Sequence, residues 1–179
     1  EQVTFDPSDV VERVLAEHPE AMLAVEVIGR GFKVNRPFPE GELTGEMVTV
    51  ELSELVAKRV TRVVVRDPNA SEDDFIRMAH RLGLQGVSYF IGYTAWLDIA
   101  PSGVDKSYGL AAVCLDLNID QADVLALGDG RNDIEMLTWA GRGVALGDAP
   151  AEVQAAADHV TGLFAEGGTV EELLRWFPG

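Results

Sequence analysis

The chain has 179 residues, of which 47% are hydrophobic, and this composition predicts one medium-sized domain or two small ones with a buried core. Its net charge is −16, from 14 Lys and Arg against 30 Asp and Glu, so a nucleic-acid backbone or an anionic membrane surface would be repelled. No apolar run approaches the ~18 residues needed to cross a bilayer and no leader pattern follows Glu1, so a cytoplasmic protein is expected. The single cysteine, Cys114, excludes a disulfide framework and a cysteine-based zinc site, and its apolar helical surroundings predict a buried thiol.

The first half of the chain predicts an α+β unit with strands in adjacent pairs. Helices are predicted over residues 6–18, 53–58 and 71–83, and strands over 21–28, 31–35, 61–67, 87–91 and 94–100. Ser8 or Asp9 would cap the first helix, and Ser71 would cap the last. Residues 36–45 are rich in proline and glycine and predict a loop.

The second half alternates helix and strand with short connections, which is typical of a parallel α/β sheet. Helices are predicted over residues 104–117, 132–141, 150–157 and 169–177, and strands over 123–127, 143–146 and 159–161. In the last helix, Thr169 and Glu172 have the spacing of a capping box. The domain boundary is expected near "DIAPSG", which divides the chain into residues 1–98 and 99–179, although the first ~10 residues could belong with the second domain.

The stretch "LALGDGRNDIEML", residues 125–137, places acids where a buried strand ends. Asp129 follows the strand between two glycines, and Asn132 and Asp133 begin the next helix, whose N-terminus favours anions. Hard oxygen ligands beside an anion site suit Mg²⁺ bridging to a phosphate. Asn132 with Glu135 also fits an ordinary capping box, and Asp133 an ordinary first-turn acid.

Lys106 lies at the start of a helix, where its charge opposes the helix dipole at a cost of ~0.3–1 kcal/mol. Pairing with Asp105 or hydration could offset this cost. If the preceding strand instead lies beside residues 123–127, Lys106 and Asp129 share one sheet edge, and a Lys–Asp–metal–phosphate cluster becomes reasonable.

Three motifs in the order "SGVDKSYGL", "VLALGDGRNDIEML" and "GRGVALGDAPAEVQAAADHVT" resemble the haloacid dehalogenase (HAD) superfamily phosphatases of the Cof type over residues 95–177. The resemblance implies the C-terminal half of a HAD-like, Rossmann-type α/β core, with residues 1–98 as an α+β cap. It also implies that Asp129 ligates Mg²⁺, that Asp133 supports the metal shell, that Asn132 touches phosphate or orients the acids, and that Lys106 is catalytic by stabilising phosphate and nucleophile. Asp148 stands where the family usually has Asn.

The family's nucleophile motif, "DxDGT", has no counterpart in this sequence. The parent protein is therefore expected to be a Mg²⁺-dependent phosphatase of a small phosphorylated metabolite, such as a sugar phosphate. It would act through an aspartyl-phosphate whose nucleophile is absent from this chain, so the chain alone would be inactive. The alternative is an inactive fragment or degenerate homologue that only binds Mg²⁺ and a phosphorylated ligand. The incomplete sheet would be covered by a second copy, by rearrangement or by the missing segment.

Overall fold

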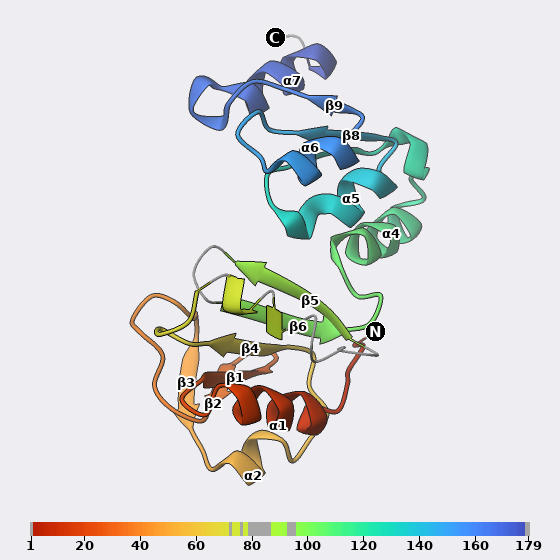
Figure 1. The fold of residues 1–179 in the computed structure, drawn as a ribbon. Coiled ribbons are helices and arrows are strands. Elements are labelled where there is room, and N and C mark those ends of the chain that lie inside the picture. Colours follow the sequence, from red (N-terminus) through yellow and green to blue (C-terminus); the bar gives the residue numbers. More distant parts are fainter. Residues whose placement is uncertain (1, 72, 76, 79–86, 93–95, 178–179) are drawn as a thin grey trace. The chain divides into compact units, whose positions relative to one another are not determined.

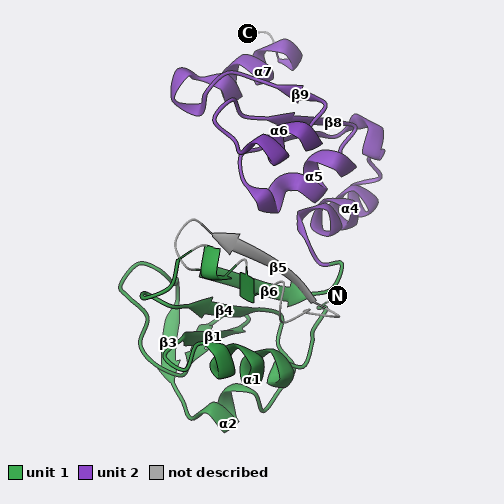
Figure 2. Cartoon of the chain, in the orientation of Figure 1, with its two compact units in different colours: residues 1–103 green, residues 104–179 purple. Residues whose placement is uncertain are grey.

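The chain divides into two compact units, residues 1–103 (unit 1) and 104–179 (unit 2), which Figure 2 colours separately. The computed structural model describes residues 2–71, 73–75, 77–78, 87–92 and 96–177, with residues 87–92 described by their backbone alone. Within these ranges, no helix combines the length and apolar character that crossing a membrane requires.

Unit 1 is built on one six-stranded sheet with the order β3-β2-β1-β4-β6-β5 (Figure 1). Its elements are α1 (Ser8–Glu17), β1 (Met22–Val27), β2 (Gly31–Val34), β3 (Glu46–Thr49), α2 (Leu52–Leu55), β4 (Val63–Arg66), β5 (Val87–Gly92) and β6 (Trp96–Pro101). All neighbouring strands are antiparallel except β2 and β3. Gly31 has a φ of +144°, and a Cβ there would lie 2.1 Å from the carbonyl oxygen of Glu46, so only glycine lets β3 approach β2 at this point.

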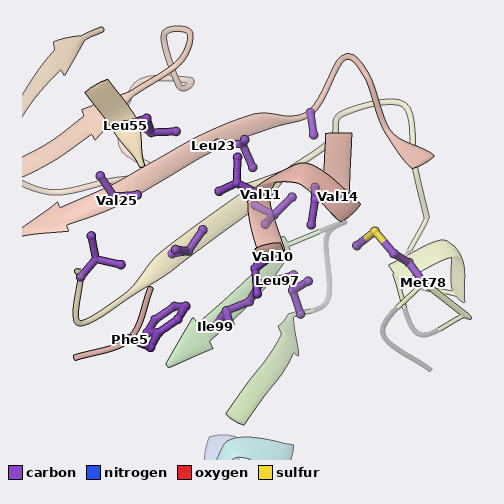
Figure 3. Close-up of a cluster of buried hydrophobic side chains, with 14 of the residues drawn as sticks. Phe5, Val10, Val11, Val14, Leu23, Val25, Leu55, Met78, Leu97 and Ile99 are labelled. Atoms are coloured by element: carbon purple, nitrogen blue, oxygen red, sulfur yellow. The ribbon is translucent and has the colours of Figure 1, made fainter. Parts of the chain in front are cut away.

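Alternation along the strands gives the unit 1 sheet a core on each face. On the first face, Leu23, Val25, Leu97 and Ile99 pack against Val14 and its neighbours on α1 (Figure 3). The second face buries a smaller cluster, in which Phe38 and Leu43 from the 35–45 loop cover the strands. The full second cluster comprises Met22, Ala24, Phe32, Val34, Phe38, Leu43 and Val64, with Trp96 packed against it.

Unit 2 contains a parallel sheet with the order β7-β8-β9, which confirms the predicted α/β class. Its elements are α4 (Lys106–Leu117), η1 (Gln121–Asp123), β7 (Leu125–Gly128), η2 (Arg131–Asp133), α5 (Ile134–Trp139), β8 (Arg142–Ala145), α6 (Ala151–Ala156), β9 (His159–Val160), η3 (Phe164–Glu166) and α7 (Gly168–Trp176), where η marks a 3₁₀ turn. Its core is small and rich in alanine: Ala126, Leu137, Ala140, Ala145, Ala149 and Val153.

Unit 2 leaves much apolar surface uncovered. Leu115 on α4 is 82% exposed and Phe177 at the end of α7 is 71% exposed. Cys114 is the one buried residue of α4, as predicted for the thiol. Among the described residues, β7 pairs with β8 alone, so its other edge has no strand partner there.

Several local predictions were wrong. The last helix begins after Gly167, which has a left-handed φ of +87°, and Glu172 is fully buried against Arg142 instead of capping the helix with Thr169. Neither Ser8 nor Asp9 caps the first helix, because both lie within α1, whose N-cap position is Pro7 and has no side-chain cap. Strand β3 was not predicted, and the helix expected over 53–58 is the single turn α2.

Other local predictions agree with the structure. The Ser71 cap is confirmed, because the N–H of Asp74 donates to Ser71 Oγ at 3.3 Å and the N–H of Ser71 donates to the Asp74 carboxylate at 2.8 Å. The rest of the 71–83 helix lies partly outside the described residues.

The domain division between residues 98 and 99 stays a prediction. Strand β6 runs through this point, and the first compact unit ends after it, at Gly103.

Candidate functional site

The acidic loop lies at the carboxyl edge of the unit 2 sheet. Gly128 ends β7 and pairs in register with Ala145, the last residue of β8. The N–H of Leu146 donates to the Gly128 carbonyl at 3.0 Å, so the two strand ends stay together. Asp129 follows immediately, and turn η2 then leads into α5. Ligands of open parallel sheets bind at this edge, which makes the loop the candidate site.

Asp133 is the organising residue of this loop. Its side chain is only 4% exposed, and one oxygen, Oδ2, accepts hydrogen bonds from the backbone N–H groups of Asp129 and Gly130, each at 3.0 Å. The other oxygen, Oδ1, forms an ion pair with Lys106. A Cβ on Gly128 would lie 2.5 Å from the Asp133 Cβ, so glycine is needed where the carboxylate folds back on the strand. The loop is therefore wrapped around a buried, hydrogen-bonded carboxylate.

Lys106 is the first residue of α4 and contacts the loop through Asp133. Asp105 caps the same helix instead of neutralising the lysine, since its Oδ1 accepts from the N–H of Tyr108 at 3.0 Å and from Ser107 Oγ at 2.5 Å. Of the alternatives that the sequence left open for Lys106, pairing with Asp105 is not the one observed. The charge that opposes the helix dipole is offset by a residue 27 positions away in the sequence.

Asp129 and Asn132 are the uncommitted polar groups of the loop. The Asp129 side chain is exposed, Asn132 is half-buried, and neither side chain forms a hydrogen bond or ion pair with any other residue that the structure describes. Helix α5 begins at Ile134 without a side-chain cap, so the capping box of Asn132 and Glu135 was wrong. The capping hypothesis holds in part for Asp133, which reaches back to the N–H of Gly130 at the start of η2.

One charged residue of the loop, Arg131, was not singled out from the sequence. Arg131, inside the loop, pairs with Glu152 on α6, and this hydrogen bond and charge hold the pKa of Glu152 below its ordinary value. A basic residue within an otherwise acidic loop was the available signal. Asp148 is exposed and accepts a hydrogen bond from the N–H of Phe164 at 3.2 Å, which ties the loop after β8 to turn η3.

The carboxylate oxygens of the loop can supply part of the coordination shell of a Mg²⁺ ion. Mg²⁺ takes one or two carboxylates and completes its octahedron with waters and phosphate oxygens. The Asp129 carboxylate is available for this, whereas both oxygens of Asp133 already have partners. Within the described ranges, no three His, Cys, Asp or Glu residues gather as a ready-made metal site.

Other candidate residues lie apart from the loop. The His18 ring nitrogen Nδ1 is hydrogen-bonded to the Asp67 carboxylate at 2.9 Å and the ring stacks on Phe75, while His80 lies outside the described residues. A groove of about 580 Å³ in unit 1 is lined by residues of α1, α2 and the ends of β2 and β3, and contains none of the predicted site residues.

Residues 43–173 match the family of haloacid dehalogenase-like hydrolases. The HMP-PP phosphatase of Cronobacter sakazakii is 32% identical over 129 residues, which cover 70% of this chain and 47% of that protein. The chain therefore spans about half the length of this curated relative.

Two solved structures share the fold. A protein from Streptococcus mutans superposes with a TM-score of 0.81 at 19% identity, covering 99% of this chain and 69% of that one. A sugar phosphatase of HAD subclass IIB gives 0.78 at 22% identity, covering 99% of this chain and 68% of the other. Because the family match extends over most of the sequence, this chain belongs to the haloacid dehalogenase-like hydrolases.

Proposed function

We propose that the chain carries the metal- and phosphate-handling residues of a cytoplasmic, Mg²⁺-dependent phosphatase that hydrolyses a small phosphorylated metabolite, such as a sugar phosphate. The observation that carries this proposal is the Lys106–Asp133 pair at the carboxyl edge of a parallel sheet, where Asp133 also binds the backbone N–H of Asp129, a residue whose carboxylate is exposed. The similarity to an HMP-PP phosphatase and the shared fold of a sugar phosphatase support it.

Each residue of the loop then has a role that follows from its contacts. Asp129 would ligate Mg²⁺, because its carboxylate is exposed and unpaired among the described residues. Asn132 would donate its amide to a phosphate oxygen. Lys106, whose side chain is 48% exposed, would place its ammonium near the transferred phosphoryl group. Asp133 would hold Lys106 and the loop backbone in place, and would reach the metal only through water. A bound Mg²⁺ would neutralise phosphoryl charge.

The attacking group would come from polypeptide outside these 179 residues, because no strand in the sequence ends in "DxD". Unit 1 would serve as the α+β cap of the assembled enzyme.

Turnover of p-nitrophenyl phosphate by the natural full-length gene product tests the proposal. Asp129→Ala should lower Mg²⁺-dependent kcat at least ~100-fold, because it removes a metal ligand. Asp116→Ala, which removes an exposed carboxylate from α4, is the matched control and should keep activity. Unchanged activity in the Asp129 variant would remove this residue from the mechanism.

The second candidate is a non-catalytic homologue that binds Mg²⁺ and a phosphorylated ligand, which the missing "DxDGT" favours. It predicts no phosphate release from the full-length product, together with Mn²⁺ binding that Asp129→Ala abolishes. The two candidates therefore differ in turnover and share the metal site.

Self-association through unit 2 is a further part of the proposal. A second copy of the chain would cover the exposed apolar residues of α4 and α7 and the edge of β7 that has no strand partner among the residues described. Sedimentation velocity should then detect dimers, and more of them at high salt, which screens the net charge of −16. Leu115→Glu should shift the chain to monomer.

A further inference from the structure

The second face of the unit 1 sheet is only partly covered. Phe38 and Leu43 shield its apolar part, but the strands also place polar residues on this face. Glu26 pairs in register with Phe32 on β2, and its N–H donates to the carbonyl of Arg62 at 3.1 Å. Trp96 and Asp98 alternate on the same face of β6. We call the group formed by Glu26, Phe32, Arg62, Trp96 and Asp98 the Arg62 patch.

Asp98 uses its two oxygens on two different donors. Its Oδ1 accepts from Arg62 Nε at 2.7 Å, and its Oδ2 accepts from Trp96 Nε1 at 2.9 Å. Arg62 therefore does not make the two-bond fork that guanidinium and carboxylate groups commonly form. Its terminal nitrogens have no hydrogen-bond partner among the residues that the structure describes, although its side chain is only 38% exposed.

Arg62 keeps its charge in this position. Burial acts to lower the pKa of Arg62, but the hydrogen bond that Arg62 donates to Asp98 and the charges of Asp98 and Glu26 outweigh it and raise the pKa above its ordinary value. The guanidinium lies 6.0 Å from the centre of the Phe32 ring, so it is held between an aromatic ring and a carboxylate. A fixed, half-desolvated guanidinium with unused donors is well suited to a ligand with two neighbouring oxygen acceptors.

The charge of the patch selects among such ligands. Two carboxylates, Glu26 and Asp98, accompany one guanidinium, so an anionic ligand would meet net repulsion. Neighbouring hydroxyl groups avoid this repulsion, because they accept hydrogen bonds from a guanidinium and donate to carboxylates. Apolar C–H groups of the same ligand could lie on Trp96, which is half-buried, whereas Phe32 is buried in the core and contacts Arg62 instead.

We propose that the Arg62 patch binds an uncharged, polyhydroxylated organic group, with vicinal hydroxyls accepting from Arg62 and donating to Glu26 and Asp98. The link to the proposed function is that this group would be the organic part of the phosphorylated metabolite. Binding to the patch itself requires no phosphate chemistry.

The test uses the 179-residue chain and ribitol, with 1,5-pentanediol as the probe that has five carbons but no vicinal hydroxyls. Ribitol should change the fluorescence of Trp96 saturably, and pentanediol should not. Arg62→Lys keeps the charge but removes the terminal guanidinium N–H groups that would bind two neighbouring hydroxyls. This variant should raise the apparent Kd for ribitol about tenfold, as should Asp98→Asn. Trp96→Phe should abolish the signal, since the other tryptophans, Trp139 and Trp176, lie in unit 2.

Arg36→Gln is the matched control, because it removes another Arg–carboxylate pair of unit 1, Arg36 with Glu20 at 2.7 Å, and should leave the Kd unchanged. Three results would overturn the proposal: no saturable response to ribitol, the same Kd in the Arg62 and Asp98 variants as in the wild type, or an equal response to pentanediol. If the chain does not bind ribitol while the full-length product is an active phosphatase, only the binding proposal for the Arg62 patch is rejected. Ribitol binding without phosphatase activity rejects the proposed function alone.

Discussion

The two units differ in how completely they bury their apolar residues. Unit 1 packs side chains on both faces of its sheet, and among the described residues only four of its large hydrophobic side chains are exposed. Unit 2 is smaller, yet thirteen of its described large hydrophobic side chains are exposed, and its core is mostly alanine. The contrast shows that unit 1 buries most of its described large apolar side chains, whereas unit 2 exposes many of them on α4 and α7, and an apolar surface of this kind is typical of a contact site.

The largest effects should come from truncating the two cores separately. Leu97→Ala in unit 1 and Leu137→Ala in unit 2 each remove a fully buried side chain and should lower the free energy of unfolding of their own unit by about 2–5 kcal/mol. Urea unfolding measures both, because Trp96 reports on unit 1 while Trp139 and Trp176 report on unit 2. If each variant shifted both transitions equally, the units would not be energetically separate.

Leu115→Ala is the control for the core truncations. Its side chain is 82% exposed, so its loss should change the stability of the monomer by less than ~0.5 kcal/mol. A large destabilisation would show that α4 is covered in solution.

The next largest effect concerns the acidic loop. Asp133→Ala leaves the N–H groups of Asp129 and Gly130 without their acceptor and should destabilise unit 2 by about 1–3 kcal/mol. Amide hydrogen exchange at these two positions should also become faster. Asp129→Ala, which removes only an exposed carboxylate, should leave both measurements nearly unchanged; a similar loss in this variant would contradict the organising role of Asp133.

A comparison of two glycines tests the same loop with a smaller change. Gly128→Ala places a Cβ 2.5 Å from the Asp133 Cβ and should cost about 1–3 kcal/mol, because the strand and the carboxylate must move apart. In Gly130→Ala the contact, at 2.6 Å, is with the end of the Asn132 side chain, which can rotate away. Urea midpoints should therefore fall clearly more for the first variant, and the reverse order would argue against the packing described here.

The smallest expected effect is a pH dependence of unit 2. The hydrogen bond from Arg142, assisted by Trp176, holds the pKa of Glu172 below its ordinary value of 4.5, despite the burial that acts to raise it. Because the pKa is lower in the folded state, this contribution is fully present above about pH 4.5 and is lost as the pH falls through the folded-state pKa. Glu172→Gln should weaken the acid dependence of the unit 2 transition.

Glu171→Gln is the matched control for the pH experiment, since Glu171 forms an exposed pair with Arg175 on the same helix. In the Glu171→Gln variant, the stability of unit 2 should fall with decreasing pH as it does in the wild type. Equal slopes for the Glu172 variant and the wild type would show that the buried carboxylate does not contribute.

The sequence predicted the alternation of unit 2 and the place of the acidic loop, because both depend on local patterns. It could not choose the partner of Lys106. The conflict with the helix dipole required a nearby negative charge, but Asp105 was equally available, and only tertiary folding brought Asp133 close. Glu172 illustrates the same limit: its spacing from Thr169 fits a capping box, yet Arg142 on β8 takes its carboxylate. Strand β3 was missed because all its residues are exposed and show no apolar alternation.

The chain passes between the units once, at Gly103, where the backbone adopts a φ of +72°. No strand or helix spans that point, and each unit is one uninterrupted stretch of sequence. A gene could therefore be divided or recombined at this codon without breaking any hydrogen-bonded ladder, so the module that carries the Arg62 patch could be exchanged between proteins while the acidic loop is inherited unchanged.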